Sequence, residues 1–356
     1  MQLMCTSAEN PLATGVTEAQ AVKAASKDKL REGGIMNILV TGAAGFIGSH
    51  LTDYLLTRGH TVTGLDDLST GSLDNLYLAL GHPNFRFVKG TILDEALVDE
   101  LTGEAATVYH LAAAVGVFLI QGETLQSMRT NIRGTENVAE AASRHNARLL
   151  IASTSEVYGK NTKVGLTEDD DRITGSPLKS RWSYSEAKAV DESLVNGYVR
   201  ERGLRAAIAR LFNTVGPRQT GHYGMVIPRF VQQALADRPL TVFGTGEQVR
   251  CFCHVADVVP TLARLAGTPA AYGRAVNLGS SEQVSINELA RRVIRLTGST
   301  STTVSVPYLD AYGTGYEDME RRVPDCTLAW NLDGFAPVRT LDDIIRSVAG
   351  FYRGES

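Results

Sequence analysis

Three things are scarce in this 356-residue sequence: long apolar runs, an excess of basic residues, and cysteine. No stretch comes near the roughly 18 consecutive apolar residues that a membrane-spanning helix needs, so we expect no membrane partner. The formal net charge of -4 leaves no basic surface for nucleic acid. We therefore expect a small-molecule ligand and a location in the cytoplasm.

Cysteine occurs at only four positions, 5, 251, 253 and 326, and no two of them have CxxC spacing. Zinc knuckles and ribbons need such pairs, so we predict no metal site. Cys251 and Cys253 alternate along a predicted strand and share one of its faces. In a cytoplasmic protein we interpret the cysteines as reduced, partly buried thiols.

The pattern of apolar residues changes at Met36. Residues 1–35 are polar, and we predict a flexible N-terminal extension without a functional role. Over residues 36–213, short apolar runs alternate with helical stretches. This alternation is typical of a parallel sheet covered on both faces, so the predicted fold class is α/β, a Rossmann-like doubly wound parallel sheet.

Residues 214–356 are less regularly spaced. They predict a smaller α+β part that mainly binds substrate and returns segments to the first domain. Ligands of open α/β sheets lie at the carboxyl ends of the strands, so the site should be the cleft between the two parts.

A glycine-rich turn, "TGAAGFIGSHL", follows the first strong strand. Gly42 permits a tight turn, Gly45 lets the backbone approach a pyrophosphate, and Gly48 lets the helix pack closely. A glycine trio also occurs for packing alone, and the spacing is GxxGxxG rather than GxGxxG, but its place between strand and helix favours a dinucleotide site. The other members of this predicted site in the turn are Ala44, Phe46 and Ile47.

Asp66 and Asp67 end the second predicted strand, roughly 20 residues past the glycines. A carboxylate there accepts hydrogen bonds from the adenosine ribose and repels a 2′-phosphate. The sequence therefore favours NAD over NADP, with a turn or helix cap as the alternative role for Asp66.

Tyr184 and Lys188, in "YSEAK", stand four residues apart and thus on one face of a predicted helix. A phenol has a pKa near 10 and is a poor base at neutral pH, but a fixed ammonium beside it would lower that pKa. We therefore expect Tyr184 to act as a base. A lone YxxxK pair often only decorates a solvated helix, but this pair follows a glycine turn, Asp66 and a strand that ends in hydroxyls, "IASTSE".

Seven ordered motifs, "TGAAGFIG", "LDDLSTG", "HLAA", "NIRGTEN", "STSEVYG", "YSEAK" and "RLFNTVGPRQ", resemble the extended short-chain dehydrogenase/reductase family of nucleotide-sugar epimerases, dehydratases and decarboxylases. The resemblance covers Met36 to the C-terminus. It implies that Thr154 hydrogen-bonds the reacting sugar oxygen, with Tyr184 as base and Lys188 on the nicotinamide ribose. It also implies NAD contacts at His110, Ala112 and Asn131, a substrate contact at Asn213, and a homodimer formed by helices around residues 120–145 and 183–202. Where relatives often read "GDI", this chain has Thr91 in "KGTI", so the adenine contact stays open.

The residues after Thr154 distinguish the reactions within this resemblance. The 4,6-dehydratases resemble "TDE", in which the Asp protonates the departing hydroxyl; Ser155 cannot do so. "TSE" is similar to UDP-glucuronate decarboxylases. Oxidation of glucuronate at C4 gives a β-keto acid that readily loses CO₂, and Ser155 and Glu156 would manage the carboxylate and the protonation of the enol. A carboxylate tied to local backbone is the alternative for Glu156.

The tail "YGTGYEDMERRVPD" resembles the aminoarabinose-pathway decarboxylase, in which the match to Arg322 is an arginine near the substrate carboxyl. A bidentate pair with a sugar acid would suit it. The diphosphate is an equal alternative for Arg322 and the better one for Arg250, and a salt bridge is open for both.

We therefore predict NAD-dependent decarboxylation of UDP-glucuronate to UDP-xylose, UDP-4-keto-pentose or both. A UDP-sugar 4-epimerase is the nearest alternative, followed by a nucleotide-sugar 4,6-dehydratase. A non-catalytic NAD sensor would be expected to lack Tyr184 or Lys188, and the sequence has both.

Overall fold

The computed structural model describes residues 34–116, 122–221, 225–312 and 317–355. The chain divides into two compact units, Met1–Ile35 and Met36–Ser356. The predictions for residues 1–33 and for Cys5 fall outside the described residues. All elements described below belong to the second unit.

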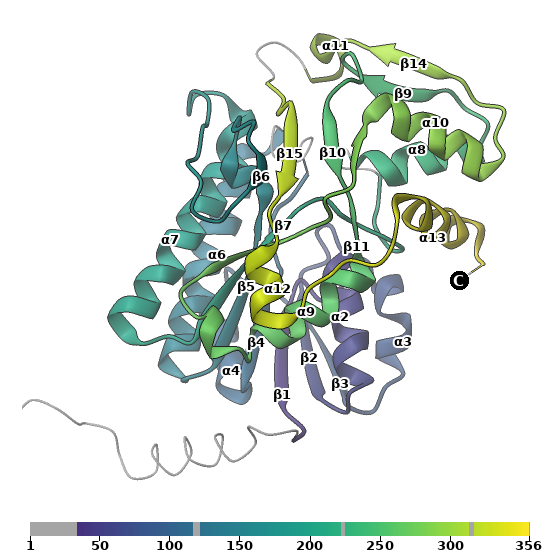
Figure 1. Cartoon of the computed structure of the whole chain (residues 1–356). Coiled ribbons are helices and arrows are strands. Elements are labelled where there is room, and N and C mark those ends of the chain that lie inside the picture. The colour runs from purple at the N-terminus through teal and green to yellow at the C-terminus, as the bar shows by residue number, and fades with distance from the viewer. Residues whose placement is uncertain (1–33, 117–121, 222–224, 313–316, 356) are drawn as a thin grey trace, which may run out of the picture. The chain divides into compact units, whose positions relative to one another are not determined.

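A seven-stranded parallel sheet runs through this unit in the order β12-β7-β5-β4-β1-β2-β3 (Figure 1). The strand order reverses between β1 and β4, and a ligand crevice is expected at such a switch point. The strands are β1 (Asn37–Thr41), β2 (Thr61–Asp66), β3 (Phe85–Lys89), β4 (Thr107–His110), β5 (Arg148–Thr154), β7 (Ala206–Leu211) and β12 (Ala275–Leu278). The predicted Rossmann-like sheet is thus confirmed.

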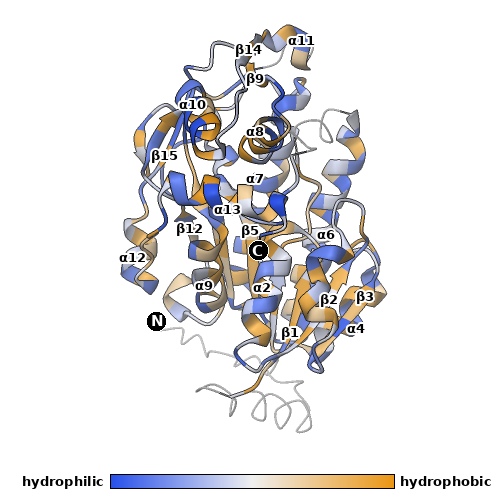
Figure 2. Ribbon diagram, turned by 90° about the vertical axis from the view of Figure 1, so that its right-hand side faces the viewer, coloured by the Kyte–Doolittle hydropathy of each residue, from blue (hydrophilic) through white to orange (hydrophobic). Residues whose placement is uncertain are grey.

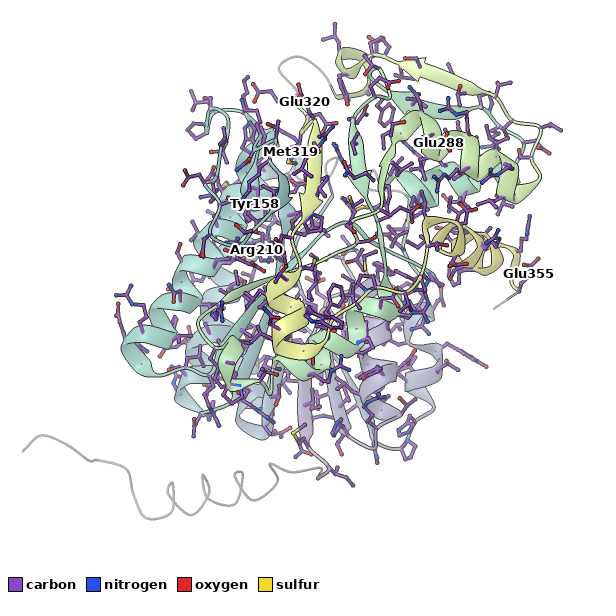
Figure 3. All side chains as sticks on the ribbon, viewed as in Figure 1. Tyr158, Arg210, Glu288, Met319, Glu320 and Glu355 are labelled. Carbon is purple, nitrogen blue, oxygen red and sulfur yellow. The ribbon has the colours of Figure 1, made fainter. Side chains whose placement is uncertain are left out.

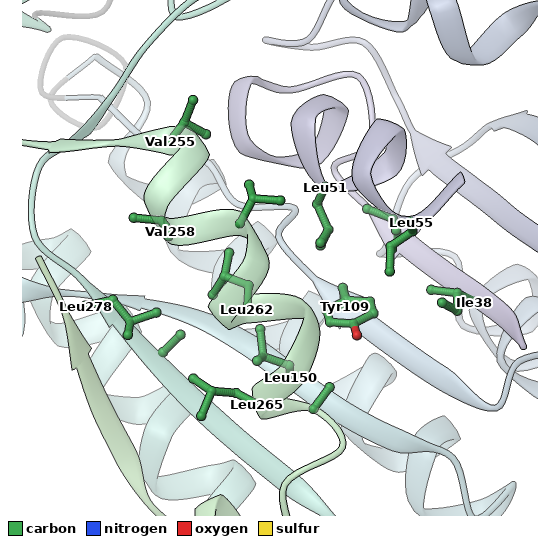
Figure 4. Close-up of a cluster of buried hydrophobic side chains, with 14 of the residues drawn as sticks. Ile38, Leu51, Leu55, Tyr109, Leu150, Val255, Val258, Leu262, Leu265 and Leu278 are labelled. Atoms are coloured by element: carbon green, nitrogen blue, oxygen red, sulfur yellow. The ribbon is translucent and has the colours of Figure 1, made fainter. Parts of the chain in front are cut away.

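Helices cover both faces of this sheet because its strands are apolar on both sides (Figure 2). In β1, Ile38 and Val40 pack on one face with Leu51 and Val258 (Figure 4), whereas Leu39 packs on the other. The first face carries α2 (Phe46–Leu56), α9 (Val255–Leu265) and α12 (Thr327–Asp333), and the second carries α4 (Glu95–Glu104), α6 (Thr124–Arg144) and α7 (Ser183–Arg202).

A smaller α+β part has a core of its own. Its four-stranded sheet has the order β13-β10-β15-β6, and a pair of parallel strands, β9 and β14, lies beside it. The strands are β6 (Val164–Leu166), β9 (Leu240–Phe243), β10 (Val249–Cys251), β13 (Gln283–Ser285), β14 (Thr303–Val306) and β15 (Arg321–Pro324), and the helices are α8 (Val226–Leu235), α10 (Ile286–Thr297), α11 (Tyr308–Tyr312) and α13 (Leu341–Arg353).

The two parts exchange segments. β12 and α9 come from the C-terminal stretch but belong to the large sheet and its cover, and β6 comes from the N-terminal stretch but joins the small sheet. A two-stranded sheet of β8 (Thr214–Val215) and β11 (Cys253–His254), and the short helices η1 (Leu73–Leu76), α3 (Tyr77–Leu80) and η4 (Pro269–Ala271), complete the fold. The boundary after Asn213 stays a prediction. In the part of the chain that the structure describes, no helix has the length and apolar character needed to cross a membrane.

Candidate active site

A cavity of about 1170 Å³ opens where the strands of the large sheet end. Its wall includes Gly42 after β1, Asp66 at the end of β2, Ala112 after β4 and Thr154 at the end of β5. Small-molecule pockets usually measure about 300–1,000 Å³. The size therefore suits two ligands, a dinucleotide and a second molecule beside it.

The glycine turn fits a pyrophosphate. Gly42 has a φ of 72°, and a Cβ there would lie 2.6 Å from the backbone nitrogen of Ala112. At Gly48 a Cβ would lie 2.0 Å from the carbonyl oxygen of Gly42, so this glycine allows α2 to approach the turn itself. Gly45 precedes Phe46, the first residue of α2, and has no side chain to fill the space in front of the helix N-terminus.

Asp66 fixes the second strand to this turn. Its Oδ2 accepts a hydrogen bond of 2.9 Å from the backbone of Ala44, and its Oδ1 accepts one of 2.8 Å from Leu68. Burial raises the pKa of Asp66, and the backbone hydrogen bonds oppose this. A carboxylate has about four lone-pair sites in all, so a ribose hydroxyl can bind beside these backbone groups, and the turn-capping role and the ribose role are compatible. Asp67 also lines the cavity.

Three of the predicted cofactor residues lie behind the cavity wall and do not line it: Ala44, His110 and Asn131. His110 is 1% exposed and lies 2.8 Å from the Thr41 hydroxyl through Nδ1 and 3.1 Å from the Thr135 hydroxyl through Nε2. Burial lowers the pKa of His110 to about 3, so the imidazole is neutral. Asn131 clamps both backbone groups of Ala114, which does line the cavity.

The catalytic candidates meet between β5 and α7. Thr154, Ser155, Glu156, Tyr184 and Lys188 all line the cavity. The 3-10 helix η2 (Ser155–Tyr158) begins after Thr154, whose hydroxyl accepts a 3.2 Å hydrogen bond from the backbone of Glu156. The Ser185 hydroxyl donates a 2.9 Å hydrogen bond to the Glu156 carbonyl and so ties α7 to η2.

A buried network supports the far end of η2. The Tyr158 hydroxyl donates to Asn277 Oδ1 at 2.7 Å and accepts from Arg210 Nη1 at 2.9 Å. Figure 3 shows that Tyr158, the last residue of η2, and Arg210, on β7 of the large sheet, lie close to one another. Arg210 also forms a two-pronged ion pair with Glu192 of α7. The strand end, η2 and the catalytic helix are thus held together by side chains that do not line the cavity.

The expected effect of Lys188, a lower pKa of Tyr184, stays a prediction, and other groups oppose it. The pKa of Tyr184 is raised, first by burial and then by the carboxylates of Glu156 and Asp191. The Lys188 ammonium lies 3.1 Å from Asp191 Oδ2, and both side chains are buried. Because this carboxylate balances the lysine, the ammonium does not act on the phenol alone.

A cluster of charged side chains surrounds Ser155. Arg181 Nη1 donates a 2.8 Å hydrogen bond to Glu156 Oε2, while Arg322 Nη1 lies 3.3 Å from the Ser155 hydroxyl and 3.7 Å from Glu156 Oε1. Burial opposes ionisation of Glu156, but the two guanidinium groups outweigh it and hold the pKa of Glu156 below its usual value. Glu156 is therefore an ionised carboxylate that belongs to the cluster. The alternative, a carboxylate tied to local backbone, leaves out its contacts with Arg181 and Arg322.

Arg250 and Arg322 are neighbours on adjacent strands, because β10 and β15 pair them in register. Arg250 Nη2 donates a 2.9 Å hydrogen bond to Asp318, which also accepts one of 2.8 Å from the Tyr308 hydroxyl. Burial, and then Arg250, lower the pKa of Arg322 to about 10. Each of the two arginines thus has the salt bridge that the sequence left open, and both line the cavity.

Three further predicted site residues remain to be placed. Phe46, Ile47 and Asn213 line the cavity, and Asn213 also donates a 2.8 Å hydrogen bond to the carbonyl of Cys251. Cys251, Cys253 and Cys326 are free thiols. Within the described ranges, no three His, Cys, Asp or Glu side chains gather to hold a metal ion.

The sequence interpretation missed Arg181, Asp191 and Asp318. Arg181 stands three residues before Tyr184, a spacing that places both on one side of a helix, and this signal was available. Asp191 has the same spacing from Lys188. For Asp318 there was no local signal, because its pairing with Arg250 depends on how β10 and β15 meet.

Known proteins resemble both the sequence and the structure. The NAD dependent epimerase/dehydratase family model matches residues 38–279. A UDP-N-acetyl-alpha-D-glucosaminuronate decarboxylase of Bacillus cytotoxicus is 38% identical over 88% of this chain and 97% of its own length. A UDP-glucuronic acid decarboxylase 1 of Xenopus tropicalis is 36% identical over 89% of this chain and 72% of its own length.

A solved structure of similar fold is the UDP-glucuronic acid 4-epimerase of Bacillus cereus, in complex with UDP-glucuronic acid and NAD. It has a TM-score of 0.81 and 28% identity, over 90% of this chain and 99% of that one. The family model covers more than half of the chain, and the matched region holds the glycine turn, Asp66, Tyr184 and Lys188. The chain belongs to the NAD-dependent epimerase/dehydratase family.

Proposed function

We propose that this protein is an NAD-dependent UDP-glucuronate decarboxylase. The observation that carries the proposal is the charge of the cluster at Ser155. Arg181 and Arg322 are buried there against the single carboxylate of Glu156, while Arg250 is matched by Asp318. Among the described residues, the side chains paired in this cluster carry one more positive than negative charge, and an excess charge out of water is costly. A sugar carboxylate would balance it at the sugar end, whereas a neutral hexose would bring no charge there and would leave that role to the diphosphate.

The charge alone does not separate a decarboxylase from an epimerase that takes an acidic sugar. Ser155 and Glu156 support the decarboxylase. They place a hydroxyl and an ionised carboxylate on the cavity wall beside Tyr184, the group proposed to act at C4. The names of the relatives at 36% and 38% identity are those of decarboxylases.

The residues that would hold NAD are the glycine turn, Asp66 and Lys188. When bound there, NAD supplies an acceptor for the hydride of C4 and can return it. Thr154 would hydrogen-bond the C4 hydroxyl, and Tyr184 would remove its proton. The resulting ketone is β to the carboxylate, so the C–C bond electrons flow into the carbonyl as CO₂ leaves.

After CO₂ has left, C5 of the sugar would gain a proton from a side chain of the cluster at Ser155. Glu156 is ionised, so it can donate a proton to C5 only after it has itself taken one up from water. The Ser155 hydroxyl lies within 3.3 Å of Arg322, whose positive charge stabilises negative charge on the enolate. Protonation at C5 by Ser155, Glu156 or Arg322 completes the chemistry of the pentose, and hydride return decides between UDP-xylose and the 4-keto product.

A second candidate substrate is the N-acetylated uronate. The Bacillus cytotoxicus relative, which is 38% identical over 97% of its own length, is named for that sugar. Both sugars carry the same carboxylate, so the cluster at Ser155 suits both, and they differ only at C2.

The cytoplasmic location and the homodimer also belong to the proposal. α6 and α7 pack against one another, and Leu125 and Val190 on them are 67% and 44% exposed. A second copy would cover these apolar side chains. Sedimentation at several protein concentrations tests the dimer, which a single monomer species throughout would contradict.

The direct experiment is incubation of the purified chain with NAD and, separately, UDP-glucuronate, its N-acetylated counterpart and UDP-glucose, followed by mass spectrometry of the nucleotide sugars. Loss of the mass of CO₂ from an acidic sugar nucleotide, without change in UDP-glucose, is the expected result. Conversion of an acidic or neutral sugar nucleotide into an isomer of unchanged mass would instead establish an epimerase.

A further inference from the structure

A carboxylate with no place in the proposed chemistry lies directly behind the catalytic pair. Asp191 is on α7, three residues after Lys188, and is 0% exposed. Its Oδ2 lies 3.1 Å from the Lys188 ammonium, and neither oxygen accepts a hydrogen bond of good geometry from the described residues. Asp191 does not line the cavity. A carboxylate so placed acts on ligands only through its neighbours.

Glu192, the next residue, serves as a contrast. Its two oxygens accept hydrogen bonds of 2.9 and 2.7 Å from Arg210, so its charge is fully engaged in tying α7 to β7. Among the described residues, the ion-pair partner of Asp191 is Lys188 and not an arginine. Its charge is balanced by Lys188, the same group that the proposed mechanism needs beside Tyr184.

The other groups near Asp191 and Lys188 do not change the balance between their two charges. His110, from β4, is neutral because its pKa is about 3. Glu156, from η2, is ionised and paired with Arg181 and Arg322. From α6, the uncharged Thr135 faces both His110 and Asp191. Burial raises the pKa of Asp191, and Lys188 and Thr135 oppose this rise. Asp191 is thus the carboxylate that decides how much of the lysine charge reaches Tyr184.

We propose that Asp191 is a positioning residue that holds Lys188 and limits the positive charge that Lys188 presents to Tyr184. The physical basis is the short distance: at an effective dielectric constant of about 20, a carboxylate next to an ammonium cancels most of its field at a third group. Asp191 also acts on Tyr184 directly, and both effects disfavour the phenolate. The inference rests on the proposed function because it takes Tyr184 as the base.

The test is the pH profile of kcat/KM for NAD-dependent decarboxylation in wild type and Asp191→Asn. The near-isosteric amide removes the charge and keeps the volume. We expect the acid limb of the profile to move to lower pH by about one unit, since a neighbouring charge commonly shifts a pKa by that much. At the foot of the limb the variant would then be about tenfold faster relative to its own maximum.

A matched control is Asp333→Asn. Asp333 is a well-buried carboxylate on α12 that pairs with Arg264 at 2.6 Å, outside the cavity. Its loss is expected to lower the melting temperature and leave the acid limb in place. An Asp191→Asn variant that behaves in the same way, less stable but with an unmoved acid limb, would overturn the proposal.

Two further measurements keep the proposal open to refutation. Should Asp191→Asn not fold, Asp191→Ser takes its place, since the smaller hydroxyl leaves room for water beside Lys188. In the ligand-free protein, the ¹³Cζ resonance of Tyr184, assigned through Tyr184→Phe, is expected to titrate at lower pH in Asp191→Asn than in wild type; equal midpoints in the two proteins contradict the proposal. This titration does not depend on any sugar substrate, so it distinguishes a failed inference from a failed assignment of function.

Discussion

The two ends of the cavity are built in different ways. At the cofactor end, glycines without side chains, a helix N-terminus and one carboxylate tied to the backbone at Ala44 and Leu68 form the wall. At the sugar end, charged side chains from η2, η3 (Ser180–Trp182), β10 and β15 form ion pairs and hydrogen bonds around Ser155. The first end depends on backbone geometry, and the second depends on a balance of charges.

This difference predicts which substitutions each end of the cavity tolerates. A backbone site tolerates changes of charge but not an added methyl group, because packed main chain cannot move aside. A charge cluster tolerates changes of shape better than the loss of one partner, because the remaining charge is then buried and unpaired. Four substitutions separate these behaviours.

The largest effect is expected for Gly48→Ala at the cofactor end. The new Cβ would lie 2.0 Å from the carbonyl oxygen of Gly42, so α2 must leave the turn. We expect loss of NAD binding by more than about 100-fold and a loss of several kcal/mol in the free energy of unfolding. Calorimetric titration with NAD and urea unfolding measure the two. Gly197→Ala is the control, since a Cβ at that helical glycine meets nothing within 4 Å; NAD binding by Gly48→Ala at the wild-type affinity would contradict the account.

Next in size is Arg322→Met at the sugar end. Removal of the guanidinium leaves Glu156 with Arg181 alone, and it takes away the charged neighbour of Ser155 and the proposed partner of the substrate carboxylate. Truncating one member of a buried charge pair costs about 2–5 kcal/mol, so we expect kcat/KM for UDP-glucuronate to fall about 100-fold while NAD affinity stays the same. Arg321→Met, on the same strand but outside the cavity, is the control. Equal losses for both variants would mean that the strand rather than the charge had been disturbed.

His110→Gln tests the buried layer of side chains behind the cavity wall. Burial lowers the pKa of His110 from 6.5 to about 3, so between these values the unfolded chain binds more protons than the folded one. The stability that His110 contributes is present above pH 6.5 and is lost as the pH falls. At a pH of about 5 the loss is about 2 kcal/mol. Urea unfolding at neutral and acidic pH should therefore show a smaller acid loss in the variant than in wild type, and an equal loss would show that His110 does not carry it.

Asp66→Asn should have the smallest effect. The amide keeps an acceptor for one backbone hydrogen bond but loses the negative charge. We expect the dissociation constant for NAD to rise about tenfold, equivalent to about 1.4 kcal/mol, and the preference for NAD over NADP to shrink. Decarboxylation at saturating NAD should stay near the wild-type rate, since Asp66 lies at the far end from Ser155. A large loss of rate at saturating cofactor would contradict the separation of the two ends.

Much of the cofactor end could be predicted from the sequence because its determinants are local. The glycine spacing, the strand before it and the acid after the next strand are all read within about 30 residues. The fold class followed from the same alternation of apolar runs and helices. His110 and Asn131 came from motifs, and the structure places them behind the wall, which a motif without distances does not reveal.

The sugar end was harder to predict because its charges pair through tertiary contacts. Arg322 and Glu156 were found, but their ion pair joins η2 to β15, which are far apart in the sequence. The prediction that Lys188 lowers the pKa of Tyr184 counted one ammonium, whereas burial, Glu156 and Asp191 raise that pKa and Asp191 pairs with the lysine. The pKa of a buried group depends on all the charges around it, whereas the YxxxK spacing identifies only one of them.

The most direct test of the central claim is to follow the carboxyl carbon itself. The chain is incubated with NAD and UDP-glucuronate that carries an isotopic label in its carboxyl group, and labelled CO₂ is measured for wild type, Tyr184→Phe and Glu156→Gln. The account predicts NAD-dependent release of labelled CO₂ by wild type, almost none by Tyr184→Phe, and strongly reduced release by Glu156→Gln. Retention of the label in a sugar nucleotide whose C4 configuration has inverted would contradict decarboxylation and establish an epimerase.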